Sequence, residues 1–210
     1  MADRPSPRIS PRKHPKQARS TELVAAILEA AVQVLVKEGA RRFTTARVAE
    51  KVGVSVGSLY QYFPNKAAIL FRLQSDEWRE TSGLMREILE DGGRPPLERL
   101  GILVQAFVRS ECEEAAVRIA LGDAAPLYRD APEAREAKQG VDLAFRSFMR
   151  EALPDAPEAT RDLAADLIET TLSEVGRRFS ETPRSAEETE TYAGAMADMF
   201  CAYLRSLEGC

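Results

Sequence analysis

The chain has little of what metal sites and hydrolases need. Its 210 residues include one histidine, His14, and three cysteines, Cys112, Cys201 and Cys210. The cysteines are far apart and odd in number, so they match neither a zinc site nor a disulfide framework, and we expect reduced thiols. The sequence also lacks a zinc motif, a P-loop, a dinucleotide fingerprint and a serine or cysteine paired with histidine. It therefore favours a protein that is not an enzyme, with no metal and no resident cofactor.

Long apolar runs are also missing. The chain is 44% hydrophobic and 30% charged, which is typical of a globular protein. No apolar run approaches the length that a membrane-spanning helix needs. The first twenty residues, MADRPSPRISPRKHPKQARS, are basic and polar and have no apolar core of a secretory signal. We therefore expect a cytoplasmic protein without a membrane partner.

Positive charge is in deficit overall but concentrated in the first third. The formal net charge is −4, yet Met1–Lys66 carries twelve Lys and Arg against five Asp and Glu. The rest of the chain carries seventeen against twenty-eight. A basic first third on an acidic body indicates a segment that faces a polyanion. Residues 4–19 alone supply six of the positive charges, so a solvated basic tail is the alternative.

Strand-like alternation is missing, and apolar residues recur instead with helical spacing. The predicted fold class is all-α with about nine helices, and capping residues and Gly/Pro punctuation place their ends. The expected helices cover about 16–38, 44–51, 55–63, 65–90, 97–110, 113–122, 133–153, 158–180 and 187–208. The predicted domains are an extended basic, Pro-rich arm over 1–17, a DNA-binding domain over 18–78 and a helical body over 79–210.

Residues 44–70, TTARVAEKVGVSVGSLYQYFPNKAAIL, contain two conflicting motifs. Gly53-Val54-Ser55-Val56-Gly57 spells G-x-S-x-G, the nucleophile elbow of the α/β-hydrolases. An elbow needs a buried strand before its serine and a general-base histidine later in the chain. The segment before Ser55 has helical spacing, and His14 lies upstream. Without a base Ser55 is an ordinary alcohol, so this motif is a coincidence.

The same stretch fits a helix-turn-helix better. Thr44 and Ser55 are suitable N-caps for two short helices, and Gly53 permits the turn between them. The second helix of such a unit enters the major groove, where Gln61 can form a bidentate contact with adenine. Tyr60 and Tyr62 can bind phosphates, and Lys66 adds a charge at the start of the next helix. The alternative is an aromatic packing stretch; it accounts for Leu59 and Phe63 as core but leaves Tyr60 and Gln61 unexplained.

The segments AAVQVLVKEG and FTTARVAEKVGVSVGSLYQYFPNKAAIL resemble the DNA-binding domain of the TetR family of bacterial transcriptional regulators. The resemblance covers about residues 18–78. It implies an all-helical homodimer in which helices one to three bind DNA and helix four leads to a ligand-binding body. Ala46 departs from members that have arginine there, and we expect Arg47 to contact phosphate instead. The DNA contacts that the resemblance implies are Thr45, Val56, Gly57, Ser58, Tyr60, Gln61, Tyr62 and Lys66.

The body carries two further sets of candidate residues. The resemblance implies that the last two helices form a four-helix dimer interface, although both helices could pack only on their own core. The expected interface residues are Leu167, Leu172, Val175, Phe179, Met196, Met199, Phe200 and Tyr203. A ligand pocket is expected between helix four and the helices at 97–110, 133–153 and 158–180. Its candidate residues, each of which also fits plain core or surface, are Trp78, Leu103, Phe107, Glu111, Phe145, Phe148, Met149 and Glu174.

These patterns lead to one functional hypothesis and one alternative. The hypothesis is a repressor that binds a pseudo-palindromic double-stranded DNA operator as a homodimer and is released by a small-molecule effector. The alternative is a ligand-independent, weakly specific, nucleoid-like DNA-binding protein that uses the basic first third.

Overall fold

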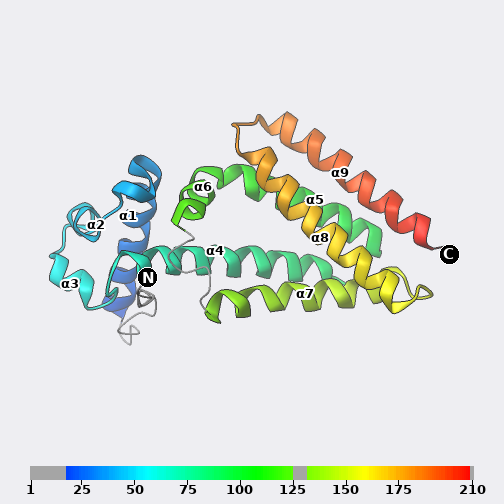
Figure 1. Ribbon diagram of the computed structural model, residues 1–210, viewed down its shortest axis with the longest axis horizontal. Helices are drawn as coiled ribbons and strands as arrows, with labels where there is room; N and C mark the ends of the chain where they lie inside the picture. Colours follow the sequence, from blue (N-terminus) through cyan, green and yellow to red (C-terminus); the bar gives the residue numbers. More distant parts are fainter. Residues whose placement is uncertain (1–17, 125–131, 209–210) are drawn as a thin grey trace, which may run out of the picture. The chain divides into compact units, whose positions relative to one another are not determined.

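The computed structural model describes residues 18–124 and 132–208, and all regular structure within these ranges is helical (Figure 1). The predicted all-α class is confirmed. The helices are α1 Ala18–Arg42, α2 Thr45–Val52, α3 Val56–Tyr60, α4 Lys66–Leu89, α5 Pro96–Glu113, α6 Ala115–Ala124, α7 Pro132–Ala152, α8 Glu158–Ser180 and α9 Ala186–Leu207. His14, Cys210 and the predicted arm lie outside the described residues.

The chain forms two compact units. The head unit contains the described parts of Met1–Glu77 and Ala116–Ala134, and the body unit contains Trp78–Ala115 and Arg135–Cys210. Helix α6 thus groups with α1, α2, α3 and the first half of α4, because the boundary between the units falls inside α4. The predicted boundary after residue 78 is a functional assignment and stays a prediction.

Local capping residues place the ends of α1 and α4. Gly39 breaks α1 with φ 74° and ψ 164°, where the sequence predicted the helix to end. Asn65 begins α4 as an N-cap, because its Oδ1 accepts a hydrogen bond from the Ala68 N–H at 2.9 Å. The segment after α4 carries the expected stop, since Asp91 Oδ1 accepts from the Gly93 N–H at 3.1 Å.

The core of the head unit is a set of large apolar side chains from α1, α2, α3, α4 and the segments that connect them. Ile27, Leu35, Phe43, Val48, Leu59, Phe63, Ile69 and Leu70 are each no more than 2% exposed. Full burial of one such side chain contributes about 1.5–3 kcal/mol. A polar pair joins α4 to α6: Arg118 Nη1 lies 3.0 Å from Glu77 Oε1, and Gln74 donates to the same carboxylate at 2.6 Å. These contacts hold α6 against the head.

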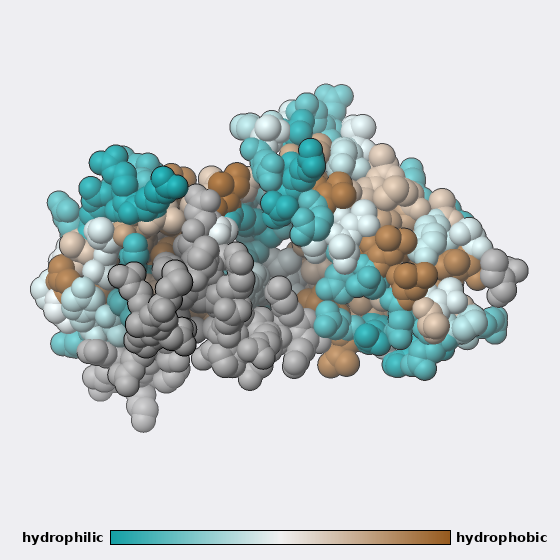
Figure 2. Space-filling model, in the orientation of Figure 1, coloured by the Kyte–Doolittle hydropathy of each residue, from teal (hydrophilic) through white to brown (hydrophobic). Residues whose placement is uncertain are grey.

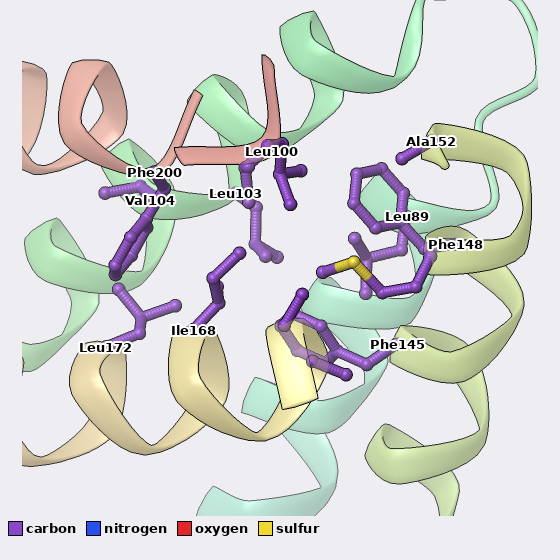
Figure 3. Close-up of a cluster of buried hydrophobic side chains, with 14 of the residues drawn as sticks. Leu89, Leu100, Leu103, Val104, Phe145, Phe148, Ala152, Ile168, Leu172 and Phe200 are labelled. Atoms are coloured by element: carbon purple, nitrogen blue, oxygen red, sulfur yellow. The ribbon is translucent and has the colours of Figure 1, made fainter. Parts of the chain in front are cut away.

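The body unit has its own apolar core, to which α4, α5, α7, α8 and α9 contribute (Figure 3). Leu100, Leu103 and Val104 of α5 lie at its centre with no exposed area. Gly176 allows α8 to approach α5 closely, because a Cβ at this position would lie 2.9 Å from the Phe107 ring. The structure therefore depends on a glycine at this crossing.

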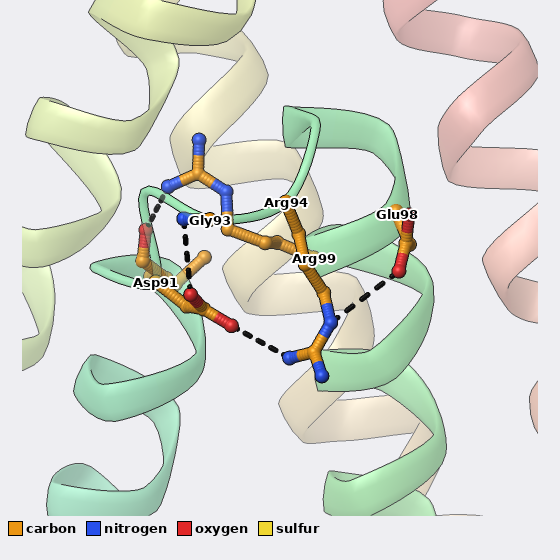
Figure 4. Close-up of polar contacts among 6 residues, drawn as sticks. Asp91, Gly93, Arg94, Glu98 and Arg99 are labelled. Carbon is orange, nitrogen blue, oxygen red and sulfur yellow. Dashed lines mark hydrogen bonds and ion pairs between the residues drawn. The ribbon is translucent and has the colours of Figure 1, made fainter.

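A buried arginine ties three helices of the body together. Arg99, on α5, is 1% exposed and donates through Nη1 to the carbonyl of Leu89, the last residue of α4. Its Nη2 forms an ion pair with Glu151 of α7, and its guanidinium lies 5.4 Å from the centre of the Phe148 ring. Figure 4 shows Arg99 beside the turn between α4 and α5, where Arg94 pairs with Asp91 at 2.6 Å and with Glu98 at 3.4 Å.

The ion pair predicts a pH dependence of stability. The hydrogen bond from Arg99 lowers the pKa of Glu151 below its ordinary value. A carboxyl whose pKa is lower in the folded state stabilises the fold above its unfolded pKa of about 4.3 and loses that contribution as pH falls through the folded pKa. We expect Glu151→Gln to be less stable than the wild type at pH 7. Urea unfolding at pH 7 and below pH 4 should show the difference shrinking on acidification, and a constant difference would contradict the assignment.

Candidate DNA-recognition surface

The turn between α2 and α3 has the geometry of a helix-turn-helix. Gly53 adopts φ 79° and ψ 30°, and its N–H bonds to the carbonyls of Ala49 and Glu50 at 3.0 and 3.1 Å. Ser55 then caps α3, because its Oγ accepts from the Ser58 N–H at 3.0 Å. A helix rather than a strand precedes Ser55, so the structure supports rejecting the nucleophile elbow.

Helix α3 is shorter than predicted. It covers five residues, Val56–Tyr60, rather than continuing to Phe63. Pro64 explains the difference, because a proline disfavours helical backbone at the residue before it. The last turn tightens, with N–H bonds from Gln61 to Ser58 and from Tyr62 to Leu59 at 3.2 and 3.0 Å. Gln61 keeps a helical backbone as the C-cap, with φ −66° and ψ −28°.

The helix-turn-helix separates core residues from accessible ones. Leu59 and Phe63 are 0% and 2% exposed, which confirms that they face the core. The predicted contact residues lie on the other side: Gly57, Tyr60, Gln61 and Lys66 are exposed, and Thr45, Val56, Ser58 and Tyr62 are half-buried. The structure thus leaves every one of them at least partly accessible. Their contact with DNA stays a prediction.

Two of the predicted contact residues touch each other. Thr45 Oγ1, at the start of α2, lies 3.2 Å from the Tyr60 hydroxyl at the end of α3. This hydrogen bond crosses the turn and links the first helix of the unit to the second. No sequence pattern predicted it.

Arg47 is less available for DNA than the sequence indicated. Its Nη1 forms an ion pair with Glu38 and donates to the Arg42 carbonyl at 3.0 Å. A phosphate would therefore compete with an internal carboxylate for this guanidinium. The predicted phosphate contact of Arg47 stays a prediction, with a rival partner that the sequence pattern does not reveal.

The predicted ligand residues fall into two groups. Leu103, Phe107, Phe145, Phe148 and Met149 are all part of the buried core of the body unit, and Glu111 is buried at 5% exposure. Trp78 is half-buried. Glu174 is exposed and pairs with Arg177 at 2.8 Å, away from the core cluster. The structure gathers five of the six apolar candidates in this core, leaves Trp78 outside it and places Glu174 on the surface.

The predicted dimer residues differ in how exposed they are. Leu172, Met196 and Phe200 are buried in the core of their own chain. Leu167 and Met199 are 47% and 53% exposed, and Val175, Phe179 and Tyr203 are half-buried. Leu163, one turn before Leu167 on α8, is 62% exposed and was not among the predicted interface residues. Its i, i+4 spacing to Leu167 was the available sequence signal.

The described residues contain no group of three or more His, Cys, Asp or Glu side chains suited to hold a metal ion. Cys112 and Cys201 are free thiols. Burial raises the pKa of the Cys201 thiol, whose Sγ lies 3.5 Å from the Leu97 carbonyl oxygen. The described helices also include none that is long and apolar enough to cross a membrane.

A helix-turn-helix with capped helices is a DNA-binding unit, and here it is part of a chain whose described regular structure is all helical. Two family models match the chain: "Bacterial regulatory proteins, tetR family" over residues 27–73 and "Tetracyclin repressor-like, C-terminal domain" over residues 95–207. The chain belongs to the TetR family and is a DNA-binding transcriptional regulator.

The chain is also similar to individual proteins in sequence and in fold. The chain is 29% identical over 145 residues to the nucleoid occlusion factor SlmA of Aliivibrio fischeri, covering 68% of this chain and 70% of that protein. It is 31% identical over 139 residues to the HTH-type transcriptional repressor KstR of Rhodococcus jostii, covering 66% and 63%. The structure of the regulator FadR from Bacillus subtilis in complex with stearoyl-CoA has the same fold, with TM-score 0.68, 17% identity and coverage of 85% and 97%.

Proposed function

We propose that this regulator is a dimeric repressor that reads a pseudo-palindromic operator through α3 and is released by a small apolar effector. The observation that carries the proposal is the division of one short segment into two faces. Leu59 is fully buried, while Gly57 and Gln61 on the same segment are exposed beside a capped turn. This arrangement fixes the backbone through the core and leaves an amide for base readout.

The surface residues have distinct roles in this proposal. Gln61 contacts a base edge, and Gly57 and Ser58 allow α3 to approach the groove closely. Lys66 is exposed in the first turn of α4, and the N-terminus of a helix favours a phosphate. In this proposal the neutral Gln61 reads a base, and the positive Lys66 positions the protein on a phosphate. No catalytic residue and no resident cofactor are part of the proposal, and its setting is the cytoplasm.

Dimerisation is assigned to α8 and α9. Leu163, Leu167 and Met199 expose 62%, 47% and 53% of their area, and exposed apolar residues that gather on one face mark interaction sites. Figure 2 shows hydrophobic residues gathered on the face where Figure 1 places α8. A second copy would bury these side chains in an isologous interface. The two recognition helices would then meet successive major grooves about 34–36 Å apart.

The effector is assigned to the body unit, whose interior is apolar. A ligand changes DNA affinity only if it binds the released conformation more tightly than the DNA-bound one. The Bacillus subtilis relative of similar fold binds stearoyl-CoA, which makes this compound a suitable first probe. We expect an apolar effector to raise the unfolding temperature of the protein and to weaken operator binding in the same concentration range.

The experiment that tests the proposal is selection of bound DNA from a random duplex pool by the purified full chain at near-physiological salt. Two inverted half-sites whose centres lie about 10–10.5 base pairs apart, or a multiple of that, are expected. No enrichment from dimeric, folded protein would overturn sequence-specific regulation.

A nucleoid-like role is the second candidate function. It is favoured by the likeness to SlmA of Aliivibrio fischeri, which is a nucleoid occlusion factor by name. A weakly specific, nucleoid-like protein would bind operator and random DNA with similar affinity and would not respond to an effector. Salt dependence alone does not separate the two functions, because phosphate contacts dominate both.

A further inference from the structure

The Thr45–Tyr60 contact carries an inference about how this regulator holds DNA, which rests on the proposed function. Thr45 begins α2 and Tyr60 ends α3, fifteen residues later in the chain. Their side-chain oxygens lie 3.2 Å apart at the exposed surface of the head unit. The two hydroxyls therefore belong to different helices but to one hydrogen-bonded pair.

The hydrogen bond between the two hydroxyls limits how many protons they can donate to DNA. Each hydroxyl has one proton to donate and two lone pairs to accept with. One of the two protons lies in the bond between them, so the pair keeps a single O–H that can point outward. Whichever oxygen donates inward, the pair offers DNA one donor and not two.

Exposure indicates which hydroxyl faces outward. Tyr60 is 40% exposed, whereas Thr45 is half-buried. The favoured arrangement has Thr45 donating to the Tyr60 oxygen and the Tyr60 O–H pointing away from the protein. A hydroxyl that accepts a hydrogen bond becomes a better donor, because bonds in a chain polarise one another.

We propose that Thr45 and Tyr60 act as one phosphate-binding donor, in which Thr45 is a positioning residue for the Tyr60 hydroxyl. Threonine and tyrosine hydroxyls commonly bind the DNA backbone, and this pair is exposed on the helix-turn-helix. A single outward proton cannot distinguish base edges with different patterns of donors and acceptors. The pair therefore contributes affinity and register, while Gln61 contributes base selectivity.

This arrangement differs measurably from two independent contacts. Removing either hydroxyl from a single unit loses the same contact, so a second removal costs little more. Independent contacts lose affinity separately, and their effects multiply. A double-mutant cycle measures this difference directly.

The test uses the selected operator, the full chain and the variants Thr45→Val, Tyr60→Phe and their combination, with Kd measured by fluorescence anisotropy. Removing a hydrogen bond to a charged group raises Kd by about tenfold or more. We expect each single variant to raise Kd by about tenfold, and the double variant to raise it by no more than about twofold beyond that. A double variant near about 100-fold, the product of the single losses, would overturn the inference.

Controls separate positioning from folding. Thr45→Ser keeps the hydroxyl and is expected to bind like the wild type, and Thr45→Ala repeats the removal with a strong helix former. The loss should be the same on the operator and on duplexes with one base pair changed, as for a phosphate contact. A loss of affinity that depends on the changed base pair would contradict the inference. Weak operator binding by Thr45→Ser would contradict it as well.

The outcomes also separate this inference from the function on which it rests. If the wild type selects no operator, the proposed function fails and the inference fails with it. If the wild type selects an operator but the cycle is additive, only the inference fails.

Discussion

Replacing Leu167 with glutamate is expected to convert the dimer into monomers and to weaken operator binding by about 100-fold or more. Leu167 is 47% exposed on α8, so the change leaves no cavity and adds no buried charge in the single chain. In an isologous interface the substitution acts twice, because each chain contributes the same surface. Two carboxylates would then lose their hydration at an apolar contact, which costs several kcal/mol for each.

Light scattering after size exclusion gives the oligomeric state of the Leu167→Glu variant, and anisotropy gives its operator affinity. Leu143→Glu on α7 is the matched control, because Leu143 is 68% exposed and lies on neither α8 nor α9. The control should remain dimeric and bind normally. A Leu167→Glu variant that stays dimeric at micromolar concentration would refute the assignment of the interface to this face.

Replacing Arg99 with alanine is expected to lower the free energy of unfolding by about 3 kcal/mol. The substitution removes a nearly fully buried side chain, the donor to the Leu89 carbonyl and the cation beside the Phe148 ring. It leaves a cavity at the crossing of α4, α5 and α7. Glu151 adds little to the loss, because it is 52% exposed and stays hydrated without its partner.

Urea denaturation of the two proteins measures this loss. Arg150→Ala is the control: Arg150 is 63% exposed, and its contact with Glu158 is 3.9 Å long. We expect a change of less than about 0.5 kcal/mol there. Arg99→Met should be intermediate, since methionine refills much of the volume but does not bind the Leu89 carbonyl. Equal stability of Arg99→Ala and Arg150→Ala would show that the buried arginine does not hold the three helices together.

Sequence predicted most helix ends because capping is local chemistry. Ser55 and Asn65 accept hydrogen bonds from N–H groups three residues ahead, so a short window of sequence contains the whole interaction. The same reasoning placed the break in α1 at Gly39, although the helix is prolonged beyond this break to Arg42. It missed the early end of α3, where the effect of Pro64 on Phe63 outweighed the apolar i, i+4 spacing of Leu59 and Phe63.

Contacts between distant residues were not predictable in this way. Arg99 looks like a surface residue in sequence because its partners, Leu89 and Glu151, are ten and fifty-two residues away. Arg47 likewise gives no sign of its pairing with Glu38. The apolar residues of α8 and α9 recur with helical spacing on every apolar side of the helix. This spacing does not show which side faces the chain's own core and which side is open to a partner. Leu172 and Leu167 therefore looked alike, although one is buried and the other exposed.

In the proposed function, α3 and its C-cap read base sequence. Selection from a random duplex pool, with the wild type and Gln61→Ala in parallel, tests this readout. Gln61 is exposed and takes no part in the core, so the variant should fold and dimerise normally. We expect a palindromic consensus for the wild type and loss of preference at one symmetry-related pair of positions for the variant. Discrimination at the affected base should fall by about 1–3 kcal/mol. An unchanged consensus from the variant would contradict base readout by Gln61.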